Sequence, residues 1–186
     1  MKTIFFNGIQ IENAKESDDR LNIEGYACHF NSVNMNSEIV NEDSFKYFFE
    51  LYNAKKLVPK LNYNHTQTII GGVDDIISDK TGLYMTAHVN RGVKICDEFI
   101  IPNIIQGDIS QFSTEGYIKD GYNGIIENED GSYYVKNFLL TMVAITPTPA
   151  DPDAVFTIQN FLNEYKAQKE QEKAEIDKKS RWYLIR

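Results

Sequence analysis

Short apolar runs that alternate like β-strands recur along most of this 186-residue chain, and they constrain its fold more than any other feature. Residues with strong turn preference separate the runs, as in Ser78-Asp79-Lys80-Thr81-Gly82. The strands that we predict are 3–11 with a break at Asn7-Gly8, 21–30, 57–63, 68–77, 82–89, 109–118 and 133–146. Strands in such number bury their apolar faces against one another, so the sequence predicts a mostly β architecture.

Two internal segments predict helices. Asn41-Glu42-Asp43-Ser44 precedes a helix over 45–53, and its acidic residues suit the positive end of the helix dipole. The segment 93–105 has apolar residues at helical spacing, and we expect Pro102 to bend this helix or to end its first part. The fold class is therefore α+β.

The last thirty or so residues differ from the rest of the chain. Apolar residues at helical spacing end at Tyr165, and 166–179 is almost wholly charged or polar. This pattern predicts a helix that docks at its start and extends into solvent. We therefore predict one domain over 1–156 and a charged helical tail over 157–186.

Charge and composition exclude several classes of function. The formal net charge of −8 would repel nucleic-acid phosphates, so we expect no nucleic-acid partner. No apolar stretch approaches the ~18 residues of a membrane helix, so we expect a soluble intracellular protein. The three histidines lie in unrelated contexts and Gly71-Gly72 is too short for a phosphate loop, so no metal or cofactor is predicted. Two cysteines, Cys28 and Cys96, are too few for a disulfide scaffold.

Two motifs carry residues suited to acyl transfer. Tyr63-Asn64-His65 ends one predicted strand, and Ser113 lies within another, in the sequence QFSTEGY of residues 111–117. Serine is a weak nucleophile at neutral pH until a nearby base, such as histidine, takes its proton. Ser110 is the nearest rival for Ser113, whereas Thr114 points to the other face of the strand. Of the other histidines, His29 and His88 are interpreted as structural.

These motifs and the blocks around them resemble, in the same order, those of the tailed-phage prohead proteases, the serine proteases that mature viral capsids. The resemblance covers residues 20 to 156. Its blocks are Ile23-Glu24-Gly25-Tyr26-Ala27, the segment 39–49, Leu61-Asn62-Tyr63-Asn64-His65 with Ile70-Gly71-Gly72, Gly82-Leu83-Tyr84, the segment 105–113, and Pro149-Ala150-Asp151-Pro152-Asp153-Ala154.

The resemblance implies a fold related to herpesvirus assemblin, a mostly antiparallel β-barrel surrounded by helices. It implies that His65 is the general base and Ser113 the nucleophile of a serine endopeptidase. The implied substrates are the phage scaffold, a segment of the major capsid protein, and the protease itself. The implied location is the assembling prohead in the host cytoplasm. The assemblin relatives suggest a homodimer, and a higher oligomer is the alternative.

The third catalytic group is the point where this chain departs from many relatives. They have a glutamate on the strand before the last block, where this chain has Met142. Glu115 is the candidate that we favour, because it lies two residues after Ser113 on the same face of an extended strand. Thr141 and Asn137 are polar alternatives on the last strand.

The missing carboxylate supports an alternative, a catalytically inactive capsid-assembly protein that retains the protease fold. Two further readings stay open: a cysteine protease that uses Cys96, and an unrelated β-barrel that binds a small ligand. Cys96 lies within the predicted helix 93–105, where we expect it to pack, and no sequence signature of a cysteine protease surrounds it.

Overall fold

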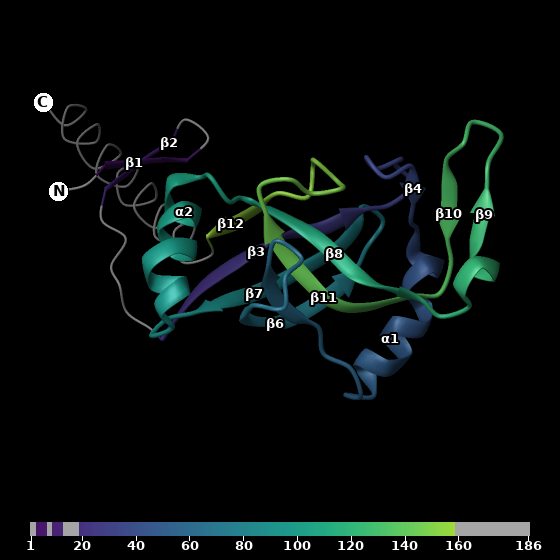
Figure 1. The fold of residues 1–186 in the computed structure, drawn as a ribbon, viewed down its shortest axis with the longest axis horizontal. Coiled ribbons are helices and arrows are strands. Elements are labelled where there is room, and N and C mark those ends of the chain that lie inside the picture. Colours follow the sequence, from purple (N-terminus) through teal and green to yellow (C-terminus); the bar gives the residue numbers. More distant parts are fainter. Residues whose placement is uncertain (1–2, 7–8, 13–18, 159–186) are drawn as a thin grey trace, which may run out of the picture.

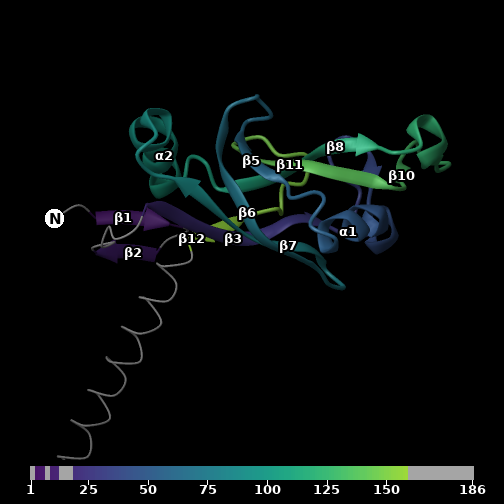
Figure 2. The same cartoon turned by 90° about the horizontal axis from the view of Figure 1, so that it is seen from below.

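The computed structural model describes residues 3–6, 9–12 and 19–158, and a strongly curled sheet of seven strands dominates it. The sheet folds over, so that β8, β11 and β5 lie across from β3 and β7 (Figures 1 and 2). Its strand order is β12-β3-β7-β6-β5-β11-β8. The strands are Arg20–His29 (β3), Lys60–Tyr63 (β5), Ile69–Ser78 (β6), Gly82–Asn90 (β7), Gln111–Ile118 (β8), Phe138–Thr146 (β11) and Phe156–Ile158 (β12).

The sheet is mixed, and it forms a half-barrel. β5 and β11 run parallel, with Leu61 opposite Val143, while the other neighbouring strands of this sheet are antiparallel. Most strand pairs are therefore antiparallel, as predicted, but the predicted barrel surrounded by helices is corrected to a curled half-barrel with two helices in the described ranges. A parallel pair needs a long crossover, which the chain between β5 and β11 supplies.

Backbone hydrogen bonds join the two ends of the curled sheet over a short seam. The N–H of Phe112 donates to the carbonyl of Ala154 at 2.7 Å, and that of Phe156 donates to the carbonyl of Ser110 at 2.9 Å. Gln111 also forms an isolated antiparallel bridge with Val155. From Ser113 to Ile118, β8 pairs only with β11 among the described residues, so its other edge is open.

Two helices lie at opposite ends of the sheet (Figures 1 and 2). A 3-10 turn, Glu42–Phe45, leads into α1, Lys46–Asn53, and the Asn41 and Ser44 side chains cap the start reciprocally. A π-helical turn, Cys96–Ile100, continues into α2, Ile101–Gln106. Both predicted helices are confirmed. Pro102 lies at the start of α2, where its missing N–H is tolerated.

The remaining strands form two small sheets. β1, Thr3–Phe6, pairs with β2, Ile9–Glu12, which confirms the break predicted at Asn7-Gly8. A second sheet has the order β4-β10-β9. Its strands are Glu38–Ile39 (β4), Tyr133–Val135 (β10) and Ile125–Glu127 (β9), and a 3-10 turn, Gly121–Gly124, precedes β9.

The prediction of one strand over 133–146 is wrong. The chain breaks between β10 and β11, where Asn137 has a positive φ of 50° that is incompatible with a continuous strand. β12 extends two residues past the predicted domain boundary at 156. The remainder of the predicted helical tail lies outside the described residues, so the domain division stays a prediction.

The core lies inside the curl of the sheet. Phe112, Leu61, Val143 and Ile145 point into it and are fully buried. Because side chains alternate along a strand, Ser113 and Glu115 on β8 face the opposite side. None of the helices in the described ranges is long and apolar enough to cross a membrane.

Candidate active site

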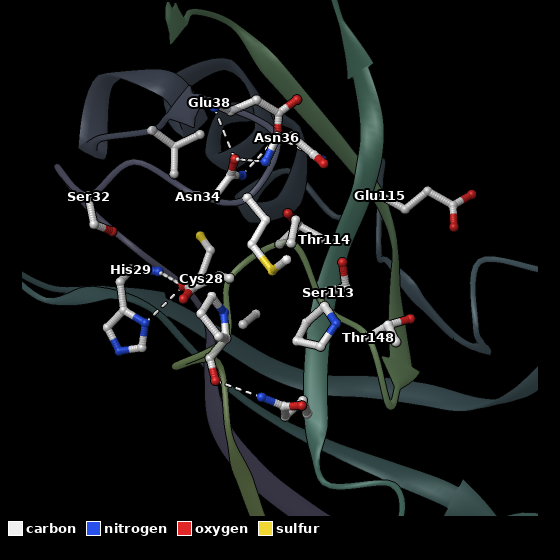
Figure 3. A pocket seen from close by; sticks show the side chains of 18 of the residues that line it. Cys28, His29, Ser32, Asn34, Asn36, Glu38, Ser113, Thr114, Glu115 and Thr148 are labelled. Atoms are coloured by element: carbon white, nitrogen blue, oxygen red, sulfur yellow. Dashed lines mark hydrogen bonds and ion pairs between the residues drawn. The ribbon is translucent and has the colours of Figure 1, made fainter. Parts of the chain in front are cut away.

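A cleft of about 810 Å³ lies beside the open edge of β8. Its walls come from the end of β3, the loop 32–40, β8 and the segment 147–152. His65, Ser113 and Glu115 all line this cleft, so the structure brings together the three site residues predicted from the sequence. Figure 3 shows Ser113, Thr114 and Glu115 along β8, with Cys28 and His29 on the facing wall.

His65 is held by a tight turn between β5 and β6. Asn64 and His65 both have positive φ angles, 50° and 57°, and the N–H of Thr66 donates to the carbonyl of Tyr63 at 3.0 Å. Positive φ at both central positions is the geometry of a type I′ turn. Asparagine and histidine are both enriched among the non-glycine residues that adopt the left-handed region, so Asn64 and His65 suit this turn.

The end of β11 fixes this turn in place. The N–H of Asn64 donates to the carbonyl of Ile145 at 3.0 Å, and the buried hydroxyl of Thr146 donates to Asn64 Oδ1 at 2.7 Å. The imidazole therefore extends from backbone tied to the strand that also pairs with β8.

The His65 ring contacts a carboxylate. Nδ1 of His65 lies 3.2 Å from Oε2 of Glu115, and the His65 and Glu115 side chains are 40% and 29% exposed. The same Oε2 accepts a hydrogen bond of 2.9 Å from Nδ2 of Asn62. A carboxylate at Nδ1 favours the tautomer with a proton on that nitrogen, and the lone pair then lies on Nε2.

Ser113 is 5% exposed and lies on the same face of β8 as Glu115. No hydrogen bond joins its hydroxyl to His65 in the part of the chain that the structure describes. Contacts of this kind are often long in substrate-free enzymes and shorten when substrate binds. The rival Ser110 lies at the seam, where its carbonyl accepts from Phe156, and it does not line the cleft.

The candidates for the third catalytic residue differ in whether they contact His65. Met142, where the family resemblance led us to expect a glutamate, lies directly opposite Glu115 in the β11–β8 pair. Thr141 donates its hydroxyl to the backbone carbonyl of Glu115, at 3.3 Å. Asn137 donates to Asp120. Glu115 is thus the one of these candidates that contacts His65.

Sequence reasoning missed Asn62, which is fully buried beneath the site. One signal for it was present, because asparagine is depleted in strands and Asn62 lies between Leu61 and Tyr63 in the strand that leads to His65.

The two other histidines each pair with an aspartate. Nδ1 of His29 lies 2.9 Å from Asp151 Oδ2, which also accepts from the His29 N–H at 2.7 Å. This contact ties the cleft segment 147–152 to β3. His88 pairs instead with Asp74, whose Oδ1 lies 2.8 Å from its Nδ1, and it does not line the cleft.

The two cysteines are buried and free. Burial raises the pKa of the Cys28 thiol to about 12 and also raises that of Cys96. Cys28 lines the cleft and Cys96 does not. Within the described ranges, no group of three or more His, Cys, Asp or Glu side chains is placed to hold a metal ion.

The fold is similar to that of two viral proteases of known structure. The structure of the capsid assembly protease of bacteriophage T4 aligns with a TM-score of 0.55 and 19% identity, over 69% of this chain and 82% of that one. The KSHV protease, solved with a hexapeptide phosphonate inhibitor, aligns with a TM-score of 0.50 and 8% identity, over 86% of this chain and 75% of that one. The chain thus has a herpesvirus-protease-like fold.

A comparison with curated proteins finds no match. The sequence model of the caudovirus prohead serine proteases, in contrast, matches residues 9–169, which is most of the chain. The cleft, the seven-stranded sheet and this match lead to one conclusion: the chain belongs to the caudovirus prohead serine protease family.

Proposed function

We propose that this chain is an active serine endopeptidase that cleaves scaffold and capsid-protein segments during prohead maturation, and also itself. The observation that carries the proposal is the contact of 3.2 Å between His65 Nδ1 and Glu115 Oε2, in a cleft that Ser113 also lines. A base, a group that orients it and a hydroxyl nucleophile are the parts that acyl transfer requires.

In the proposed mechanism, Ser113 Oγ attacks the scissile carbonyl while Nε2 of His65 takes its proton. The tetrahedral intermediate collapses, the C–N bond breaks, and His65 gives the proton to the leaving amine. Water then hydrolyses the acyl-enzyme with His65 again as the base. Glu115 holds the imidazole in the required tautomer and stabilises its charged form.

The open edge of β8 supports binding of an extended peptide. On the side away from β11, the N–H of Phe112 donates to Ala154. Alternate residues of a strand present their N–H groups on the same side, so Thr114 and Gly116 present theirs at the open edge. Both residues line the cleft. A substrate segment is expected to add here as a further strand.

Co-expression with the cognate capsid and scaffold proteins tests the proposal. We expect the wild-type chain to shorten at least one of these proteins, as read by intact mass. Ser113→Ala should abolish the shortening, and His65→Ala should abolish it or nearly so. Ser110→Ala is the matched control, because Ser110 is on the same segment but outside the cleft. Adding wild-type protein to purified Ser113→Ala protein tests self-cleavage between molecules.

Two results would contradict the proposal. Equal shortening by wild type and Ser113→Ala would exclude Ser113 as the nucleophile. Unchanged masses in all samples, with every protein folded, would favour the inactive assembly protein. The His65–Glu115 contact favours catalysis over that alternative, because it supplies a carboxylate that Met142 lacks.

A further inference from the structure

We propose that Asn62 is a positioning residue for this site: its side-chain amide holds the Glu115 carboxylate so that Oε2 faces Nδ1 of His65. The inference rests on the proposed function. Its basis is that two hydrogen bonds converge on one oxygen, 2.9 Å from Asn62 Nδ2 and 3.2 Å from His65 Nδ1. A carboxylate fixed from both sides cannot rotate away from the imidazole.

The register of three adjacent strands brings Asn62 to this place. Asn62 on β5 lies beside Ala144 on β11, and Ala144 lies opposite Ser113 on β8. Directly paired residues put their side chains on the same face of a sheet. Glu115, two residues after Ser113, shares that face. The small side chain of Ala144 leaves space for the Asn62 amide to reach across β11 to Glu115.

The orientation of the amide follows from its partner. Nδ2 is a donor and Oδ1 an acceptor, and an ionised carboxylate only accepts. The reverse orientation would set two acceptors against each other, so Nδ2 faces Glu115. Oδ1 then lies buried, and none of the described residues gives it a hydrogen bond.

This arrangement costs stability, and its benefit to the fold is small. Asn62 is fully buried, asparagine is disfavoured in strands, and a buried oxygen without a partner is destabilising. The second contact of Nδ2 is 3.5 Å from Met142 Sδ, which is a weak acceptor. A leucine of similar size would satisfy a purely structural requirement better. The polar side chain is explained by what it does for Glu115.

The test compares Asn62→Leu with wild type, and Met142→Leu serves as a matched control. The control removes the other contact of the Asn62 amide but leaves its bond to Glu115. For Asn62→Leu, we expect kcat to fall about 10- to 100-fold, because a small misplacement of a catalytic group is costly. We expect KM to change little and the thermal midpoint to stay equal or to rise. Met142→Leu should keep wild-type kcat.

Two further measurements separate positioning from a structural role. ¹⁵N NMR of the His65 ring should show a smaller share of the tautomer with the proton on Nδ1 in Asn62→Leu. In a Glu115→Gln background, Asn62→Leu should cause little further loss of kcat, because its effect passes through Glu115.

Several outcomes would overturn the inference. They are unchanged kcat in Asn62→Leu, full additivity with Glu115→Gln, or a wild-type tautomer signal from His65. Failure of both Asn62→Leu and Asn62→Val to fold would also overturn it, because the amide would then be needed for the fold. If the wild-type chain cleaves nothing, the proposed function fails separately, and the NMR comparison still decides the role of Asn62.

Discussion

The two thiols show how burial decides reactivity for single residues. The thiolate is the reactive form of cysteine, and burial in apolar surroundings disfavours it. Cys28 is 6% exposed with its pKa raised to about 12, and Cys96 is fully buried with a raised pKa. Neither has the environment of a catalytic cysteine.

We therefore predict that iodoacetamide at pH 8 modifies neither cysteine in the native chain and leaves cleavage intact. At this pH, far below the raised pKa of Cys28, almost all of its thiol is protonated. In urea both cysteines should react, which provides the positive control. Mass spectrometry of alkylated protein checks this. Fast native alkylation of Cys96 with loss of activity would revive the cysteine-protease interpretation.

Some site residues could be predicted from the sequence and others could not. His65 and Ser113 lie in local motifs, and the two-residue spacing of Ser113 and Glu115 defines a shared face once a strand is assumed. Asn62 could not be predicted in the same way. Its contact with Glu115 depends on β5 and β8 both flanking β11, and such a pairing leaves no pattern in one strand's sequence.

At the scale of the elements, the register of β8 and β11 places the Glu115 carboxylate beside Met142. Met142 is the position where the family resemblance led us to expect a carboxylate. Met142 and Glu115 are direct partners across the two strands, so their side chains are on the same face. The carboxylate thus comes from the neighbouring strand. His65 meets it because its turn is tied to the end of β11.

Because the two positions are paired, a carboxylate at position 142 on β11 should be able to replace the one at position 115 on β8. Glu115→Gln should lower kcat on the order of 10²- to 10⁴-fold, as expected when the group that orients a catalytic histidine is lost. The double variant Glu115→Gln/Met142→Glu should recover part of that loss. Steady-state kinetics on the shortened capsid or scaffold protein measures both. A double variant no better than Glu115→Gln alone would show that the two positions are not equivalent.

Helices and strands could be predicted where periodicity is local. The helix 93–105 is present, although a π-helical turn forms its first part. The prediction of one strand over 133–146 was wrong. Both halves of the segment are apolar, and periodicity alone does not reveal a break at Asn137. The break depends on that residue's positive φ and on the pairing of β10 with β9 and β4 rather than with β8.

For the whole molecule, the seam between β8 and residues 154–156 holds the curled sheet together. Phe156 is fully buried, and its ring lies 4.7 Å from that of Phe112, centroid to centroid. Val155 beside it is 39% exposed. Packing at the seam therefore depends on Phe156 far more than on its neighbour.

We predict that Phe156→Ala lowers the free energy of unfolding by about 3–5 kcal/mol, the usual cost of removing a buried phenylalanine. Val155→Ala should change it by about 0.5 kcal/mol or less, as is usual for surface substitutions. Urea unfolding followed by circular dichroism measures both. Similar losses in the two variants would mean that the seam contributes through its backbone alone.

The overall topology was accessible from the sequence only through the family resemblance. Periodicity predicts strands but not their order, so the parallel β5–β11 pair and the half-barrel had no local signal. Such pairings are decided by which burial arrangement satisfies all strands together. The resemblance gave the fold family, and the structure corrected the predicted barrel to a half-barrel that contains one parallel strand pair.

The seam also has a consequence for how a substrate peptide is bound. It occupies the outer edge of β8 up to Phe112, and the edge opens at Ser113. In the proposed mechanism, a peptide with its scissile bond at Ser113 follows β8 in one direction only, because residues 154–156 occupy the edge in the other direction. Only the peptide residues on one side of the scissile bond then form backbone hydrogen bonds with β8. Truncating the peptide on the paired side of the cut bond should accordingly weaken its binding more than truncating it on the other side.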